Sequence, residues 1–351
     1  MTKNGIILST ITKKPSKLFN KKRIYIAIFI GLTISGYLLY KEISQTNFTK
    51  NISQVNWTFT TFWFLFLAMC MMVLHDFAYV VRLRILTDNK LSWQKSLNVI
   101  LMWEFASAVS PGVVGGSAVA MFILNKEKIP LGKATALVVT STLLDNLFYL
   151  IIVPLVVFLV GMQSLIPINY SHFIILFWLG YGVVLLVTIL LSISLFIYPK
   201  LIKNLLLFVF KLPFIKKYNQ NVQKVARDIK LASKYIKNKP VKYWFQLMGS
   251  TILSWSARFL VVNFILMAFT TLDFYDNILI FGRQLIMWLI LLISPTPGGS
   301  GVAEYLFTSF LADFIRVSSL VVVLSILWRI ISYYPYLFIG SILLPRWLKK
   351  N

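Results

Sequence analysis

The sequence predicts an all-α, polytopic helical membrane protein built as an inverted repeat, and three observations lead to this prediction. The 351-residue chain is 58% hydrophobic and 13% charged, whereas a soluble domain is nearer about half apolar and about a quarter charged. Its apolar stretches are long enough for membrane-spanning helices and too long for the strands of a β-barrel. A glycine-rich motif interrupts the apolar sequence once in each half, as GGSAVA at Gly115–Ala120 and as GGSGVA at Gly298–Ala303.

The two motifs predict broken helices at membrane depth. The stronger break, Ser294–Glu304, holds two prolines and three glycines, which make a continuous helix improbable there. A weaker copy lies at Ser110–Ala120. Because unpaired backbone groups are unfavourable in lipid, a break of this kind persists only where protein or water surrounds it. We therefore expect a re-entrant hairpin at each place.

The first half of the membrane region, residues 24–160, follows a basic tail at residues 1–23. The tail is expected in the cytoplasm, because Lys and Arg are retained on that side of the membrane. No small-residue cleavage site follows the first apolar stretch, so we interpret it as an anchor and not as a signal peptide. The elements predicted in this half are spans at Ile24–Tyr40, Phe62–Val81 and Ala134–Val160, and a hairpin at Leu97–Leu124 that is broken at Pro111–Gly116.

The second half, residues 161–351, repeats the order span, span, hairpin, span and contains a basic cytoplasmic loop at residues 199–242. The first half begins inside and the second begins outside, so the hairpins would enter from opposite faces. About six full spans and two hairpins would then form an inverted repeat, an arrangement that builds binding sites near the bilayer midplane. The elements predicted in this half are spans at Phe173–Tyr198, Tyr243–Phe269 and Val317–Leu344, and a hairpin at Ile278–Phe314 that is broken at Pro295–Gly299.

The charge of the chain is strongly positive, with 35 Lys and Arg against 11 Asp and Glu and a net charge of +24. Most basic residues lie in tails and loops, which indicates membrane topology and attraction to anionic lipids, and argues against nucleic acid as a partner. This distribution predicts a bacterial inner-membrane protein with both termini in the cytoplasm. The only cysteine is Cys70 and the only histidines are His75 and His172, so we expect no disulfide, no metal site and no cofactor.

The helix that follows each break offers a candidate anion site, because free N–H groups and the helix dipole favour negative charge at its N-terminus. The alternative is that the glycines only let neighbouring helices approach closely. We expect the two serines of the motifs to cap these helices, and Glu304 to be either a further cap or an acid in a substrate cavity. The candidate binding residues at the breaks are Gly115, Gly116, Ser117, Pro297, Gly298, Gly299, Ser300 and Glu304.

Four further charges inside predicted spans, Asp145, Arg258, Arg283 and Arg329, complete the candidate binding set. Each costs about 2.5–3.5 kcal/mol at a helix centre unless it is paired or hydrated. Asp145 and Arg329 occupy equivalent positions in the repeat, so they are expected either to form a structural ion pair or to line a pathway. Arg258 continues a polar stripe of two serines on its helix. Arg283 lies just before the second break, where it could meet an anionic head group close to Arg258.

The two glycine-rich motifs resemble motifs of a known family. SPTPGGSGVAEYLF, at Ser294–Phe307, is close to a proline-glycine-glycine…glutamate signature, and SPGVVGGSAVAMFIL, at Ser110–Leu124, is similar to a second motif of the same family. With these motifs the chain resembles the lysylphosphatidylglycerol synthase transmembrane family, also described as flippase-like membrane proteins. The resemblance covers nearly the whole chain. It implies that Asp145 and Arg329 are the intramembrane acid and the final-helix arginine of that family.

The sequence departs from the family pattern at Ser141 and Thr142, where many members carry a Glu-Arg pair, and the first motif contains no basic residue. We expect no soluble synthase domain, so the resemblance implies translocation of a lipid and not its synthesis. His75 and Asp76 are interpreted as interior or interfacial groups and not as a catalytic pair, and the sequence shows no nucleophile–base set and no nucleotide motif. We therefore expect no catalytic residue and no enzymatic activity.

The sequence thus predicts a protein that moves a lipid or polyprenyl-linked head group between leaflets. Its partners would be membrane lipids such as an anionic phospholipid or a polyprenyl phosphate. Two alternatives remain open. An ion-coupled transporter of a small solute predicts a closed cavity, and a membrane subunit of a lipid-modifying enzyme predicts a soluble partner that co-purifies. The oligomeric state is left open.

Overall fold

The structure is a computed structural model that describes residues 57–110, 113–167, 172–198, 233–234, 236–294, 296 and 298–350, together with the single residues Thr33, Tyr37, Tyr40 and Ser44. The predicted span Ile24–Tyr40 lies almost wholly outside the described residues, as does most of the basic loop 199–242. Pro297, one of the predicted binding residues, also lies outside them.

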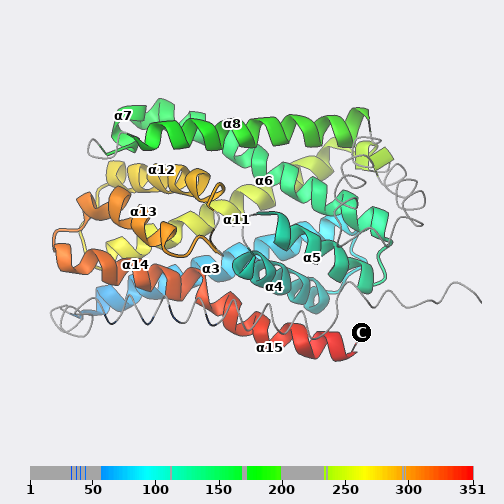
Figure 1. Ribbon diagram of the computed structural model, residues 1–351, viewed down its shortest axis with the longest axis horizontal. Helices are drawn as coiled ribbons and strands as arrows, with labels where there is room; N and C mark the ends of the chain where they lie inside the picture. Colours follow the sequence, from blue (N-terminus) through cyan, green and yellow to red (C-terminus); the bar gives the residue numbers. More distant parts are fainter. Residues whose placement is uncertain are drawn as a thin grey trace, which may run out of the picture.

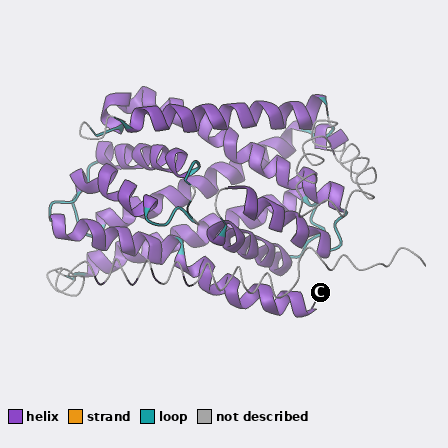
Figure 2. Ribbon diagram, in the orientation of Figure 1, coloured by secondary structure: helices purple, strands orange, loops and turns teal. Residues whose placement is uncertain are grey.

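The described part of the chain is all helical and contains no strand, which confirms the predicted fold class (Figure 2). The helices in order are α3 (Phe59–Leu86), α4 (Trp93–Val109), α5 (Val113–Lys126), α6 (Leu131–Val160), α7 (Met162–Leu165), α8 (Phe173–Ser192), the π-helix η2 (Ile193–Ile197), α11 (Val241–Met267), α12 (Phe274–Leu291), α13 (Val302–Leu311), the 3-10 turn η4 (Ala312–Phe314), α14 (Ser318–Ser332) and α15 (Tyr334–Lys350).

Six helical segments of the described chain are long and apolar enough to cross a membrane. Five of them coincide with predicted spans, and the sixth is α12, which the sequence assigned to the entering arm of the second hairpin. The repeat symmetry and the re-entrant course of the hairpins stay predictions. The six segments are Phe59–Leu86, Leu131–Val160, Phe173–Ile197, Val241–Met267, Phe274–Leu291 and Leu320–Lys349.

Local sequence explains where these helices begin and end. The Thr58 hydroxyl accepts from the Thr61 N–H at 3.3 Å at the start of α3, and the Asp273 carboxylate accepts from the Asp276 N–H at 2.7 Å at the start of α12. The chain that follows α14 bends at Tyr333, which separates α14 from α15. Helices α3 and α11 pack against one another through the centre of the molecule (Figure 1).

The two breaks differ in extent from the predicted ones. The first is short: α4 ends at Val109 and α5 already begins at Val113, so Gly115, Gly116 and Ser117 lie inside a helix. The prediction that Ser117 caps a helix starting after it is therefore wrong. The second break, between Leu291 and Val302, is long. In Figure 1 the α4–α5 pair occupies one half of the molecule and the α12–α13 pair the other, and both connecting segments face the middle.

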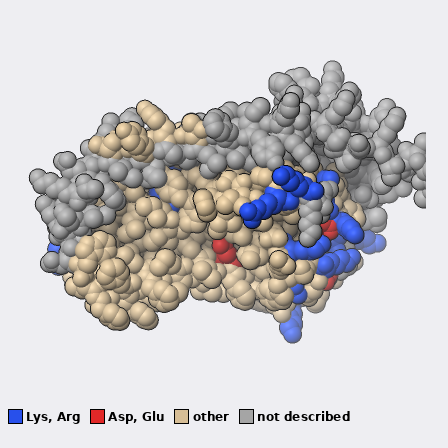
Figure 3. Space-filling model, turned by 90° about the horizontal axis from the view of Figure 1, so that it is seen from below, with Lys and Arg blue, Asp and Glu red and all other residues tan. Residues whose placement is uncertain are grey.

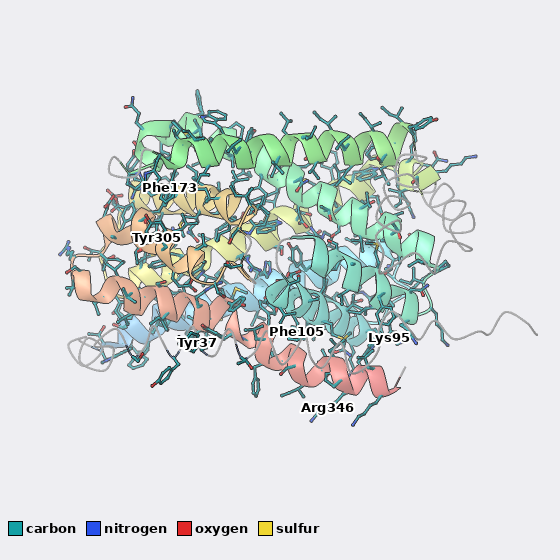
Figure 4. The ribbon with its side chains drawn as sticks, viewed as in Figure 1. Tyr37, Lys95, Phe105, Phe173, Tyr305 and Arg346 are labelled. Atoms are coloured by element: carbon teal, nitrogen blue, oxygen red, sulfur yellow. The ribbon has the colours of Figure 1, made fainter. Side chains whose placement is uncertain are left out.

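Charge gathers at one end of the molecule, where Figure 3 shows most Lys and Arg side chains, while the remaining described face is largely uncharged. Lys95 and Arg346, labelled in Figure 4, lie at this end. Ion pairs tie its loops together: Asp88 contacts Lys133 at 3.1 Å and Lys239 at 2.7 Å, and Lys95 contacts Glu127 at 2.8 Å. We refer to it as the basic end.

Candidate functional site

The centre of the helix bundle holds three arginines, and each forms an ion pair with an acid from a different helix. Arg82 of α3 lies 2.5 Å from Asp145 of α6, Arg329 of α14 lies 2.6 Å from Glu304 of α13, and Arg258 of α11 lies 3.3 Å from Glu104 of α4. Since an unpaired charge at membrane depth is strongly unfavourable, these contacts explain how the charges are accommodated.

The Arg82–Asp145 pair is the most completely bonded of the three. Both terminal nitrogens of Arg82 donate to the Asp145 carboxylate, at 2.5 and 3.3 Å. The same nitrogens also donate to the hydroxyls of Ser141, at 2.7 Å, and Thr251, at 3.1 Å. The indole N–H of Trp255 donates to Asp145 at 2.8 Å. This pair joins α3, α6 and α11 and leaves little donor capacity on Arg82 for a ligand.

The expected pair between Asp145 and Arg329 is therefore wrong. The actual partner of Asp145, Arg82, was missed because the predicted span Phe62–Val81 ended just before it, whereas α3 continues to Leu86 and buries Arg82. A signal was present in the sequence. His75, Tyr79 and Arg82 follow one another at i, i+4 and i+7, which places three polar side chains on one face of a helix.

The second break is held in place by an ion pair and by hydrogen bonds to its own backbone. One oxygen of Glu304 accepts from the Gly301 N–H at 2.6 Å, and the other accepts from Nε of Arg329 at 2.6 Å. Arg329 also donates to the carbonyl of Gly298 at 3.0 Å. Glu304, and not Ser300, therefore caps α13, so the prediction of a Ser300 cap is wrong. Because Glu304 already supplies a carboxylate there, this helix end is not a free anion site.

The glycines of the second break are required by its geometry. Gly298, Gly299 and Gly301 have φ angles of 57°, 66° and 82°, a region that side chains disfavour. A methyl group on Gly298 would collide with the Tyr333 ring, and one on Gly299 would lie 2.8 Å from Cδ2 of Leu291. The motif therefore serves close packing as well as backbone conformation.

Tyr333 connects the two breaks. Its ring packs against Gly298 and lies 4.3 Å from the guanidinium carbon of Arg329. Its hydroxyl donates to the carbonyl of Ala108 at 3.1 Å, next to the end of α4 and the first break. The two broken regions, far apart in the sequence, thus meet at one side chain on the bend between α14 and α15.

The Arg258–Glu104 pair is the most accessible of the three, with side-chain exposures of 27% and 18%. The Nη1 nitrogen of Arg258 also lies 3.2 Å from Nε2 of His75. Since arginine can only donate, Nε2 accepts, and the hydrogen on Nδ1 is donated to the carbonyl of Ser254 at 2.9 Å. His75 is therefore neutral in this arrangement. Nε and Nη2 of Arg258 have no hydrogen-bond partner among the described residues.

We call the three central arginines, their paired acids and Asp76 the central cluster. Asp76 belongs to α3. The hydroxyl of Tyr336, on α15, donates to its carboxylate at 2.8 Å. Asp76 lies within electrostatic range of Glu104 and Arg258 but forms no ion pair with a described residue.

Arg283 lies apart from this cluster. It donates to the carbonyls of Ser164, at 3.1 and 3.2 Å, and Phe310, at 2.6 Å, and it pairs with Asp313 at 2.9 Å. Arg283 thus ties α12 to α7 and to the end of α13, and it shares no contact with Arg258. The expectation that these two arginines meet one head group at the second break stays a prediction.

Sequence reasoning thus found Asp145, Arg258, Glu304 and Arg329 but missed six residues that complete the site. The missed residues are Tyr79, Arg82, Glu104, Trp255, Tyr333 and Tyr336.

Comparison with known proteins agrees with the motifs described above. Residues 24–340 match the family described as the lysylphosphatidylglycerol synthase TM region. The chain belongs to this family. A curated relative is a UPF0104 membrane protein of Archaeoglobus fulgidus, which is 22% identical over 335 residues that cover 90% of this chain and 94% of the relative. No solved structure is a significant match. This member of the synthase TM-region family is a membrane protein with several transmembrane helices.

Proposed function

We propose that this protein moves a lipid or polyprenyl-linked head group between the leaflets of a bacterial inner membrane, with both termini in the cytoplasm. The observation that carries the proposal is a polar centre, Arg258 and Glu104, that remains partly accessible beside two broken helices joined by Tyr333. Membership of a synthase TM-region family without an identified catalytic motif supports transport and not synthesis.

The physical barrier to spontaneous flipping is the loss of water around a polar head group in the hydrocarbon core. A protein lowers this barrier when it offers polar partners at membrane depth. Arg258 suits this role because its guanidinium is partly exposed and two of its nitrogens have no described partner. A phosphate group can accept from both donors at once, one on each of two oxygens, since the guanidinium fork matches its geometry.

Arg82 and Arg329 do not suit this role. Arg82 makes four hydrogen bonds to three side chains, and Arg329 is held by Glu304 and by the Gly298 carbonyl. We therefore assign them to holding the bundle and the second break in place. In the proposed inverted repeat the two hairpins approach the midplane from opposite faces, and Arg258 pairs with Glu104 of the first hairpin.

The proposal is tested by reconstituting the purified protein in liposomes and measuring the exchange of labelled lipids between leaflets. The panel contains an anionic phospholipid, a zwitterionic phospholipid and a polyprenyl phosphate. Wild-type protein should accelerate at least one of them, and Arg258→Gln should reduce that rate at least tenfold. Arg84→Gln is the matched control, because Arg84 is a half-buried arginine of α3 that contacts the Leu91 carbonyl near the basic end.

Folded wild-type protein that accelerates no lipid of the panel would overturn the proposal. Retention of a soluble partner through purification would then favour the enzyme-subunit alternative. Equal rates for the Arg258 variant and the control would mean that the head group crosses elsewhere.

A further inference from the structure

The central cluster of the described chain contains more acids than cations. Its four acids are Asp76, Glu104, Asp145 and Glu304, and its three arginines are each paired with a different acid. Asp76 is the acid that remains, and its described partner is the neutral hydroxyl of Tyr336. His75 adds no positive charge, because its geometry is that of a neutral ring accepting from Arg258.

The surroundings of Asp76 are mixed in charge. From α15 the Tyr336 hydroxyl donates to one carboxylate oxygen. From α4 and α11, Glu104 and Arg258 act on it electrostatically with opposite signs. From α14, Arg329 is held by Glu304. Two carboxylates therefore compete for one arginine, and Glu104 is the one that contacts it.

We propose that Asp76 is a proton-binding site, with Glu104 and Arg258 beside it. The proton binds the carboxylate oxygen that Tyr336 does not contact, so that an ionised carboxylate and a free proton become a neutral carboxyl group. With the proton bound, the cluster is neutral, because Glu104 balances Arg258. Without it, the cluster carries one excess negative charge at membrane depth, which is unfavourable unless a cation enters.

A proton fits this position better than a metal ion. The described residues contain no group of three or more His, Cys, Asp or Glu side chains that could hold a metal. Asp76 and Glu104 are also only half-buried by protein, so the fold itself does not enclose either carboxylate. Glu304, which the sequence suggested for this role, is already bonded through both oxygens.

Infrared difference spectroscopy of the full chain in liposomes tests the assignment directly. The spectra are recorded across a pH series at constant sodium concentration. Wild type should show the stretch of a protonated carboxyl group that disappears as the pH rises. Asp76→Asn should lose this band. Asp313→Asn, which removes a more exposed acid far from the cluster, should keep it.

A second variant keeps the test decisive if Asp76→Asn folds poorly. Tyr336→Phe retains the carboxyl group but removes its hydrogen-bond donor, so the band should persist with a shifted frequency and a shifted titration midpoint. A band that is unchanged in both variants would overturn the assignment. A titration that moves with sodium concentration at fixed pH would also overturn it, because the site would then hold a cation. No lipid is transported in this experiment, so its outcome does not depend on the proposed function.

Discussion

Breaking the Arg82–Asp145 pair should destabilise the bundle more than removing the pair altogether. Replacing Arg82 by Met leaves the Asp145 carboxylate with the Trp255 indole and without a cation. Replacing Asp145 by Leu leaves a guanidinium that is 4% exposed with only hydroxyl acceptors. Losing one partner of a buried pair costs about 3–5 kcal/mol, because the remaining charge is uncompensated.

The double variant Arg82→Met/Asp145→Leu removes both charges and leaves apolar side chains of similar size. Its loss should therefore be smaller than that of either single variant, so the coupling free energy, which is the sum of the two single losses minus the double loss, should exceed about 3 kcal/mol. For the charge left on Asp145 when Arg82 is removed, this estimate uses the lower part of the range given above for losing one partner of a buried pair. The Asp145 side chain is 20% exposed, so solvent screens part of its charge.

Equilibrium unfolding in mixed detergent micelles measures all three variants against wild type. The matched control is the cycle for Asp145 and Arg329, which share no described contact and should therefore be additive within about 0.5 kcal/mol. Additive losses for Arg82 and Asp145, or coupling between Asp145 and Arg329, would refute the reasoning and restore the pairing expected from the repeat.

Three further predictions concern the break, the bend and the topology. Gly299→Leu should abolish lipid exchange, because the φ of 66° and the contact with Leu291 force the second break out of its conformation while the rest of the bundle stays folded; Gly182→Leu, at an open helix position, should have no effect. Tyr333→Phe should lower the free energy of unfolding by about 1 kcal/mol, since a carbonyl next to the first break loses its donor; an unchanged value in micelles would contradict the link between the breaks. An impermeant thiol reagent should label Gln163→Cys from outside intact cells and not Lys95→Cys, and the reverse labelling pattern would invert the proposed topology.

The fold was largely predictable because membrane insertion depends on local sequence. Hydropathy and length placed five of the spans that the structure describes, and proline and glycine placed both breaks. The errors lie where contacts between helices, and not the local sequence, determine the structure. The serine caps failed because Val113 already continues the helix at the first break and Glu304 reaches the free N–H at the second.

Partners of buried charges could not be inferred from the repeat alone. Asp145 and Arg329 are equivalent by sequence spacing, but equivalence in a repeat does not bring two side chains into contact. Glu104 was missed because it lies in the predicted hairpin but outside the broken segment, and charged site residues were sought only at the breaks and inside predicted spans. A test of every helix face for polar residues at i, i+4 and i+7 would have found the stripe that ends at Arg82.

The three arginines differ in how many of their hydrogen-bond donors the fold uses, and this difference distinguishes those that stabilise the bundle from the one proposed to bind a head group. A guanidinium has five N–H donors, and a ligand can bind only those that the fold leaves unused. Arg82 and Arg329 direct their donors to side chains and to a backbone carbonyl, so their removal should affect stability first. Arg258 contacts Glu104 and His75 through one nitrogen and stays partly exposed, so its removal should affect transport first. The bound proton that we assign to Asp76 would strengthen this division, because it prevents a second carboxylate from competing with an anionic head group for Arg258.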